Sequence, residues 1–241
     1  EIVFSLAAKI SRSKTSEVTA QLRQANITNI ELMIQAALNA GVKKLVHTGT
    51  IDEYGNNPAP FREDMEPHPN NPYASTKYEG TKIVLAATKQ GLPTVVIRPS
   101  LTYGPGQRAG IMLIPNTVKA CMEKRDMFLP AHSTRDFLYV DDLVDGLCRA
   151  AICAPVGTIY NVATGINTNV RDVGNSINAL FGNPITISTD QEAPKDGSSA
   201  EYWMDITKAH EAFGYTPRTS LADGLVKTVV WYREHPEALT T

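Results

Sequence analysis

TVVIRP at residues 94–99 is a short run rich in apolar and β-branched residues, and two earlier runs are similar, IVFSLAA (2–8) and KKLVHT (43–48). Apolar and polar residues do not alternate in them, which is typical of strands buried on both faces. Apolar residues recur at helical spacing over 17–39 and 73–90, and Gly41 and Gly91 end these segments. The order strand, helix, strand, helix, strand predicts an α/β fold, a doubly wound parallel sheet covered by helices on both faces.

The second half of the chain has a different rhythm. Beyond Gly106 the periodicity predicts helices over residues 111–124, 141–151, 170–181, 206–213 and 221–235. Short strands are expected at 137–140, 159–162 and 185–188. We therefore expect a smaller C-terminal region beside the sheet.

The composition is that of an ordinary soluble globular protein. The 241 residues, 42% hydrophobic and 20% charged, are enough to bury a sizeable core. The net charge of −2 leaves no basic field to hold a nucleic acid or an acidic membrane surface. No apolar run approaches the roughly 18 residues of a membrane helix. We expect neither nucleic acid nor membrane as a partner.

The cysteines, the histidines and the start of the chain give three further expectations. The three cysteines are odd in number and form no C-x-x-C pair, so we expect a reducing, cytoplasmic compartment. The five histidines have no ligand spacing and predict no metal site. The chain starts with EIVFSLAA, without an initiator methionine or the basic region of a signal peptide. Because it starts inside an expected strand, we expect further sequence upstream.

Tyr73 and Lys77 carry the strongest chemical signal. In YASTK they stand four residues apart on an expected helix, and therefore share one face. An ammonium near a phenol favours the phenolate and lowers a pKa that is otherwise near 10. Such a phenol exchanges a proton with an alcohol or sugar hydroxyl. The spacing is common, and the alternative is an ordinary surface pair.

Thr50 adds a second hydroxyl to this chemistry. It follows VHTG at the end of an expected strand, where side chains of a parallel sheet reach the ligand crevice. We expect Thr50 to hydrogen-bond the substrate oxygen that Tyr73 protonates. The alternative is a strand-end residue that bonds only its own turn.

Several motifs in this order resemble the NAD-dependent epimerase/dehydratase family, the extended short-chain dehydrogenases that modify nucleotide sugars. They are LAA (6–8), N-x-x-x-x-E-L-M (26–33), GVKKLVHTGT-x-x-EYG (41–55), PYASTK (72–77), RPSLTYGPG (98–106) and RDFLYVDD (135–142). Two more resemble the closing segment of the family, DITKA-x-x-x-FGY-x-P (205–217) and L-x-x-GL-x-x-TV-x-WY (221–232). The resemblance spans nearly the whole chain and includes UDP-glucose 4-epimerases and 4-keto-sugar reductases.

The resemblance assigns roles to individual residues. It implies that Tyr73 is the acid/base, that Thr50 is the catalytic hydroxyl beside it, and that Lys77 holds the nicotinamide ribose. It also implies that Asn26 is a structural residue near the active site. Further cofactor contacts are implied at Ala7, Ala8, Thr48, Pro99 and Ser100.

For the substrate, the resemblance implies two cations. Arg135 corresponds to an arginine that binds the nucleotide diphosphate, a role suited to the forked guanidinium. Lys195 stands where many members carry an arginine. The alternative for Arg135 is a salt bridge to Asp136 or another neighbour.

The chain also departs from the family pattern. The glycine-rich turn that holds the cofactor pyrophosphate is absent, and so is the residue that separates NAD from NADP. Gly104 to Gly110 has a similar spacing, but Pro105 removes an N–H that a phosphate cradle uses. We therefore reject that segment as a dinucleotide loop. Leu101 replaces an asparagine that touches the diphosphate.

Asp52 and Glu53 leave the reaction type open. They permit a dehydratase, with an acid and a base on carboxylates, but the DEYG arrangement is more similar to that of 4-keto-sugar reductases. The alternative is a solvated loop for both side chains.

The resemblance implies a Rossmann-type NAD(P)-binding domain over residues 1–106, lacking its first strand–helix units. Residues 107–241 are expected to be mainly a substrate-binding region, interleaved with the first. The expected enzyme uses NAD or NADP for hydride transfer at C4 of a nucleotide-linked sugar, as an epimerase or a 4-keto reductase. A homodimer through the helices at 18–39 and 73–90 is expected from relatives.

Two alternatives have other functions. One is an alcohol or steroid dehydrogenase of the same superfamily, against which the cations Arg135 and Lys195 argue. The other is a truncated, non-catalytic relative that binds a partner through an open, apolar sheet edge.

Overall fold

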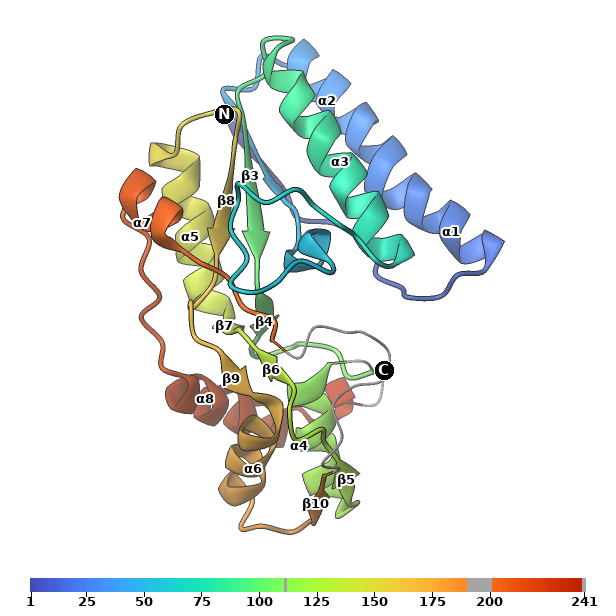
Figure 1. Cartoon of the computed structure of the whole chain (residues 1–241), viewed down its shortest axis with the longest axis vertical. Helices are drawn as coiled ribbons and strands as arrows, with labels where there is room; N and C mark the ends of the chain where they lie inside the picture. The colour runs from blue at the N-terminus through green and yellow to red at the C-terminus, as the bar shows by residue number, and fades with distance from the viewer. Residues whose placement is uncertain (111, 190–200, 240–241) are drawn as a thin grey trace.

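The central layer is a sheet of four parallel strands in the order β1-β2-β3-β8 (Figure 1). The computed structural model describes residues 1–110, 112–189 and 201–239, so Lys195 lies outside the described residues. The four strands are β1 (Ile2–Ser5), β2 (Lys44–Thr48), β3 (Thr94–Pro99) and β8 (Thr158–Val162).

Helices cover both faces of this sheet, as Figure 1 shows. Leu45 and Val96 pack among the helices of one face, whereas Val46, Val95 and Ile97 pack against the other. Successive residues within β2 and β3 are therefore buried, which explains the absence of alternation there. The first face is covered by α2 (Asn29–Asn39) and α3 (Pro72–Thr88), with α1 (Ser16–Arg23) packed against α3. The second face is covered by α5 (Val140–Cys153) and α7 (Thr207–Phe213).

The predicted helix over residues 17–39 is confirmed in extent but not in regularity. A π-helical turn at Gln24–Thr28 separates α1 from α2. It turns Asn26 into the protein, where the amide accepts the Lys9 N–H (2.9 Å) and donates to the Lys9 carbonyl (3.0 Å) and the Thr76 hydroxyl (3.1 Å). The helix thus adopts a geometry often found near functional sites in order to hold the segment that follows β1.

A second cluster of helices and small sheets packs below the main sheet in Figure 1. Its core is apolar and aromatic, with Tyr103, Tyr139, Ile114, Val173 and Val229 buried together. Its helices are α4 (Leu113–Glu123), α6 (Val170–Leu180) and α8 (Leu221–Glu234), followed by the short helix η3 (Pro236–Leu239). Its strand pairs are β4 (Leu101–Tyr103) with β7 (Phe137–Tyr139), β5 (Met127–Phe128) with β10 (Ile187–Ser188), and β6 (Thr134–Arg135) with β9 (Thr168–Asn169).

The expected elements and the observed ones agree closely. The strand predicted at 94–99 is confirmed to the residue, and α3 differs from the predicted helix by two residues at its end. The first strand is shorter than expected, because the chain leaves the sheet after Ser5 and residues 6–10 are exposed. Segments beyond residue 106 contribute β8, α5 and α7 to the main layer, so the two regions share one sheet.

The outer edge of β1 is open and apolar, as expected. Within the described residues β1 pairs with β2 alone. Ile2 is 43% exposed and Phe4 is 41% exposed. Such an edge offers unpaired backbone groups to another strand.

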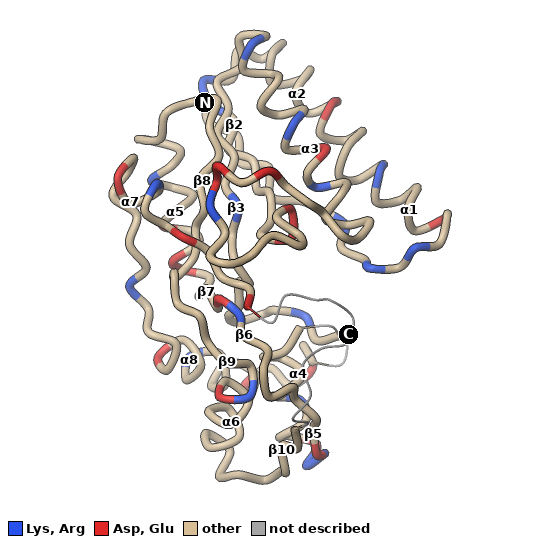
Figure 2. Tube along the Cα trace, viewed as in Figure 1, with Lys and Arg blue, Asp and Glu red and all other residues tan. Residues whose placement is uncertain are grey.

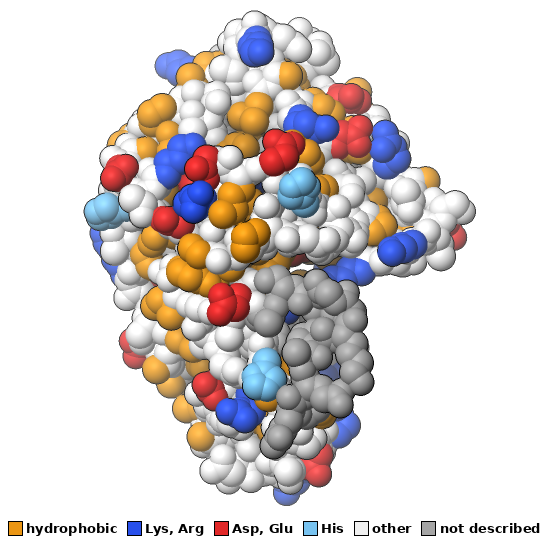
Figure 3. All heavy atoms as spheres, in the orientation of Figure 1, with side chains coloured by type: hydrophobic (Ala, Val, Ile, Leu, Met, Phe, Trp, Pro, Cys, Tyr) orange, Lys and Arg blue, Asp and Glu red, His pale blue; other side chains and the backbone are white. Residues whose placement is uncertain are grey.

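Charges are mixed along the chain and over the visible face (Figures 2 and 3). Neither view shows an extended field of one sign, in agreement with the net charge of −2. In the part of the chain that the structure describes, no helix is both long and apolar enough to cross a membrane. The described residues also bring together no group of three His, Cys, Asp or Glu side chains suited to a metal ion.

Candidate active site

The start of α3 places Tyr73 and Lys77 beside the end of β2. Asn71 caps the helix by accepting a hydrogen bond from the Ala74 N–H at 3.0 Å. Lys77 is 2% exposed, and its ammonium donates to the carbonyl of Thr48, the last residue of β2, at 2.6 Å. The lysine is thus anchored at the carboxyl end of the sheet, where open α/β folds bind ligands.

Tyr73 is half-buried and lies beside the Thr50 hydroxyl. Burial, together with the charges of Asp52 and Glu53, raises the pKa of the Tyr73 phenol well above its ordinary value. The neighbouring Thr50 hydroxyl acts in the opposite direction. The expectation that Lys77 brings this pKa toward neutrality is therefore wrong for the free protein. Lys77 is itself desolvated, and burial lowers its own pKa to about 8.

Thr50 begins a short 3-10 helix, η2 (Ile51–Tyr54). Its hydroxyl accepts the Asp52 N–H at 3.2 Å, while the Glu53 carboxylate accepts the Thr50 N–H at 3.0 Å. Glu53 is fully buried and forms an ion pair with Arg98, with 2.8 Å between Nη2 and Oε2. The alternative that Glu53 lies in a solvated loop is therefore wrong. Because its carboxylate is paired with Arg98, it is also unavailable as an acid or base.

Asp52, Tyr202 and Arg135 form a cluster across the site. The Tyr202 hydroxyl donates to the Asp52 carboxylate, and the Arg135 guanidinium lies over the Tyr202 ring, 5.3 Å from its centroid. Arg135 also donates to the Thr134 carbonyl at 2.7 Å, and burial lowers the pKa of its guanidinium. Sequence reasoning missed Tyr202, since nothing in the chain links it to residues 150 positions away.

Asp136, next to Arg135, is occupied elsewhere. Its carboxylate accepts the Ser100 hydroxyl (3.1 Å), the Thr164 N–H (2.9 Å) and the Gly165 N–H (3.0 Å). Burial raises the pKa of this carboxyl. Ser100 therefore ties the end of β3 to the chain after β8, while its neighbour Pro99 is the last residue of β3. The alternative of an Arg135–Asp136 salt bridge is not what the structure shows.

Ala7 and Ala8 follow the open edge strand and are exposed. They precede Lys9. The side-chain amide of Asn26 accepts a hydrogen bond from the Lys9 N–H and donates one to the Lys9 carbonyl. Asn26 is 1% exposed, and the structure gives it the structural role that the resemblance implied. Thr48, whose hydroxyl donates to the Ser5 carbonyl at 3.0 Å, ties the ends of β1 and β2 together.

Comparison with known proteins now identifies the family. A sequence model of the NAD dependent epimerase/dehydratase family matches residues 1–163. The chain belongs to the NAD-dependent epimerase/dehydratase family. The family and the doubly wound fold expected from the sequence are confirmed.

Three members of this family are similar over nearly the whole chain. UDP-glucose 4-epimerase of Mycolicibacterium smegmatis is 32% identical over 97% of this chain and 76% of its own length. UDP-glucose 4-epimerase of Thermotoga maritima, solved with UDP-glucose, superposes with a TM-score of 0.89 and 27% identity, over 98% of this chain and 78% of its own. UDP-glucuronic acid 4-epimerase of Bacillus cereus, solved with UDP-glucuronic acid and NAD, has a TM-score of 0.88 and 25% identity, over 97% and 76%.

The described residues fit one half of a dinucleotide. The exposed Ala7–Ala8 segment, the ends of β2 and β3 and the anchored Lys77 suit the nicotinamide and its ribose. The pyrophosphate half needs a turn of free N–H groups at a helix N-terminus. The Gly104–Gly110 segment is not that turn, because the Tyr232 hydroxyl on α8 donates to the Gln107 carbonyl and Gly106 lies against Trp231. The cofactor contacts of individual residues remain predictions.

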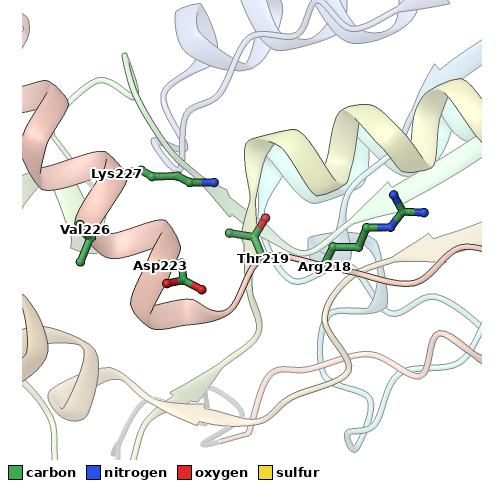
Figure 4. A pocket seen from close by; sticks show the side chains of 5 residues that line it. All are labelled: Arg218, Thr219, Asp223, Val226 and Lys227. Atoms are coloured by element: carbon green, nitrogen blue, oxygen red, sulfur yellow. The ribbon is translucent and has the colours of Figure 1, made fainter.

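A separate pocket of about 310 Å³ lies at the start of α8 (Figure 4). None of the predicted site residues lines it. Figure 4 shows the side chains of α8 and of the loop before it around this hollow. They are Arg218, Thr219, Asp223, Val226 and Lys227.

We expect Lys77 to make the stability of the protein depend on alkaline pH. Its pKa is about 8 in the folded protein against an ordinary 10.5, so the unfolded chain binds more protons between these values. The contribution of Lys77 to the free energy of unfolding is therefore fully present above about pH 10.5 and is lost as pH falls to about 8.

Chemical denaturation of wild type and Lys77→Met at pH 7.5 to 10 measures this contribution. The wild type should gain more stability with rising pH than the variant. Lys82→Met, exposed on the same helix, is the control, and equal slopes for wild type and Lys77→Met would contradict the assignment.

Proposed function

We propose that the protein is an NAD(P)-dependent 4-epimerase of a nucleotide-linked hexose, acting by hydride transfer at C4. The observation that carries the proposal is the placement of Tyr73 beside Thr50 and of the anchored Lys77 at the carboxyl end of β2. The similar 4-epimerases support it. A 4-keto reductase uses the same groups and differs in releasing the alcohol.

Each residue has a distinct task in this proposal. Tyr73 takes the proton of the C4 hydroxyl and returns it to the C4 oxygen, and Thr50 shares that hydrogen bond. Lys77 binds the ribose of the cofactor, and its charge then offsets the desolvation that raises the Tyr73 pKa. When bound, the nicotinamide supplies the hydride acceptor and donor. Ala7, Ala8, Thr48, Pro99 and Ser100 line its side of the site.

The carboxylates disfavour a 4,6-dehydratase. Loss of water across a carbon–carbon bond needs a general acid and a general base at the sugar. Glu53 is enclosed by Arg98, Thr81 and the Thr50 N–H. Asp52 is hydrogen-bonded to Tyr202. Neither is a free proton carrier.

The test combines a titration with product analysis. We would titrate the chain with NAD(H) and NADP(H) by calorimetry, and then incubate it with UDP-glucose and UDP-galactose and follow the C4 configuration by NMR. Interconversion supports a 4-epimerase. Binding of the cofactor without interconversion of any UDP- or dTDP-hexose would contradict it. Absence of cofactor binding would mean that the titrated chain is a fragment or a non-catalytic relative.

Arg135 and Lys195 are the proposed ligands of the nucleotide diphosphate. We expect Arg135→Ala to raise KM for the sugar nucleotide about tenfold or more, because a charge-assisted hydrogen bond is lost at each contact. The steady-state kinetics of this variant measure the effect. Arg149→Ala, which removes an arginine paired with Asp145 on α5, is the matched control. Unchanged KM in Arg135→Ala would favour an uncharged substrate and hence an alcohol or steroid dehydrogenase.

We also propose a cytoplasmic homodimer that associates through α1, α2 and α3. Leu32, on the outer side of this helical layer, is 63% exposed. All three cysteines are free thiols, in keeping with a reducing compartment. Sedimentation equilibrium of wild type and Leu32→Glu tests the interface, and a wild-type monomer would exclude it. Residues 107–241 are mainly the substrate region in this proposal, interleaved with the cofactor domain through β8, α5 and α7.

A further inference from the structure

A buried ion pair lies directly beneath the Thr50 loop. Glu53 is 0% exposed and Arg98 is 1% exposed. The Arg98 Nε and Nη2 atoms both lie 2.8 Å from Glu53 Oε2. The other carboxylate oxygen, Oε1, accepts the Thr50 N–H and the Thr81 hydroxyl, each at 3.0 Å. Both oxygens are thus fully used.

Stability alone does not explain this pair. Removing two charges from water costs several kcal/mol per ion, and well-packed apolar residues often do as well or better. Residue 49 also has to lack a side chain for the Glu53 carboxylate to fit, because a Cβ atom on Gly49 would lie 2.5 Å from Glu53 Oε1. The local sequence is therefore adapted to admit a carboxylate at this point.

The Glu53 carboxylate fixes the backbone of Thr50, whose hydroxyl lies beside the Tyr73 phenol. Thr50 is held extended, with φ −160° and ψ 151°, by its N–H bond to Glu53 and by the bond from the Asp52 N–H to its hydroxyl. The same hydroxyl lies beside the Tyr73 phenol. Arg98 is on β3 and lies under the Tyr54 ring, 4.6 Å from its centroid. A continuous set of contacts therefore runs from the centre of the sheet to the phenol.

We propose that Glu53, held by Arg98, is a positioning residue that sets the Thr50 hydroxyl against Tyr73 for proton transfer. This inference rests on the proposed function, in which Tyr73 is the acid/base. The ionised contact, in which Arg98 Nε donates to Oε2, keeps the carboxylate in a single orientation. A shift of the Thr50 hydroxyl would then reduce the stabilisation of the transition state more than it reduces the affinity for the substrate.

The test is a double-mutant cycle between Glu53→Gln and Thr50→Val. Glu53→Gln keeps the shape of the side chain but loses its charge. With Arg98 present, the single glutamine oxygen faces the guanidinium and no longer accepts from the Thr50 N–H. We expect it to lower kcat about tenfold and to change KM for the sugar nucleotide less than twofold. In the Thr50→Val background the same change should cost less than about twofold, because the hydroxyl that it positions is already gone. Asp145→Asn, which also leaves an arginine without its carboxylate, should leave kcat unchanged.

An equal loss in both backgrounds, or a rise in KM in place of the fall in kcat, would overturn the inference. If Glu53→Gln does not fold, Arg98→Lys replaces it, because lysine keeps the charge and loses the Nε–H that donates to Glu53. The same non-additivity with Thr50→Val is expected of that variant.

A second measurement does not depend on turnover. Amide hydrogen exchange across residues 49–54 should speed up at the Thr50 N–H in Glu53→Gln and not in Asp145→Asn. If the wild type converts no sugar nucleotide, the proposed function fails, and exchange alone then decides whether Glu53 holds Thr50. Unchanged exchange would overturn the inference by itself.

Discussion

Tyr73→Phe is expected to lower kcat by a factor of about 10² to 10⁴, the range that a positioned acid/base contributes. The phenylalanine ring fills the same half-buried place at the start of α3, so the fold and the contacts of Lys77 are retained. Only the hydroxyl that we propose exchanges a proton with the sugar is lost. Cofactor affinity should change little, and KM for the sugar nucleotide should rise a few-fold at most. Steady-state kinetics and a cofactor titration of the variant measure both quantities.

Tyr78→Phe is the matched control for this change. Tyr78 lies on the same helix, five residues further along. The Lys82 ammonium lies over its ring, 4.9 Å from the ring centroid. It makes the same chemical change without touching the Thr50 hydroxyl. Equal activity of Tyr73→Phe and wild type would remove Tyr73 from the mechanism. Equal and large losses in both variants would point to a defect of the helix.

The sequence was informative about the sheet because β2 and β3 are buried on both faces. Such strands need continuous apolar runs, and the run at 94–99 therefore marks β3 without error. The position of Tyr73 and Lys77 beside the end of β2 also follows from local signals, since helix periodicity and strand order determine it. The π-helical turn at Asn26 could not be predicted, because it depends on tertiary bonds to Lys9 and Thr76.

The electrostatics of the site were beyond sequence reasoning. The effect of Lys77 on Tyr73 was predicted from spacing, whereas the pKa of Tyr73 depends on how deeply its ring is buried and on nearby carboxylates. Glu53 reads as a loop residue, and only the approach of β3, 45 residues further on, buries it against Arg98. Tyr202 has no local signal at all. Spacing predicts which residues share a face, but burial is a property of the assembled layers.

Arg98→Met is expected to cause the largest loss of stability. The substitution leaves the Glu53 carboxylate buried with two neutral donors and no cation, and breaking a buried pair in this way costs about 3–5 kcal/mol. Methionine fills much of the space under the Tyr54 ring, so a cavity accounts for little of the effect. Denaturant unfolding of the variant at neutral pH gives the free energy.

The double variant Arg98→Met/Glu53→Gln separates charge from packing. A glutamine carries no charge, and its oxygen still accepts from the Thr50 N–H and the Thr81 hydroxyl. The double variant should therefore be more stable than Arg98→Met alone, although less stable than the wild type. If the second substitution lowers stability further, the loss in Arg98→Met comes from the missing side chain rather than from an uncompensated carboxylate. A gain, by contrast, assigns the cost to the buried charge and supports a pair that is retained for the orientation of Thr50.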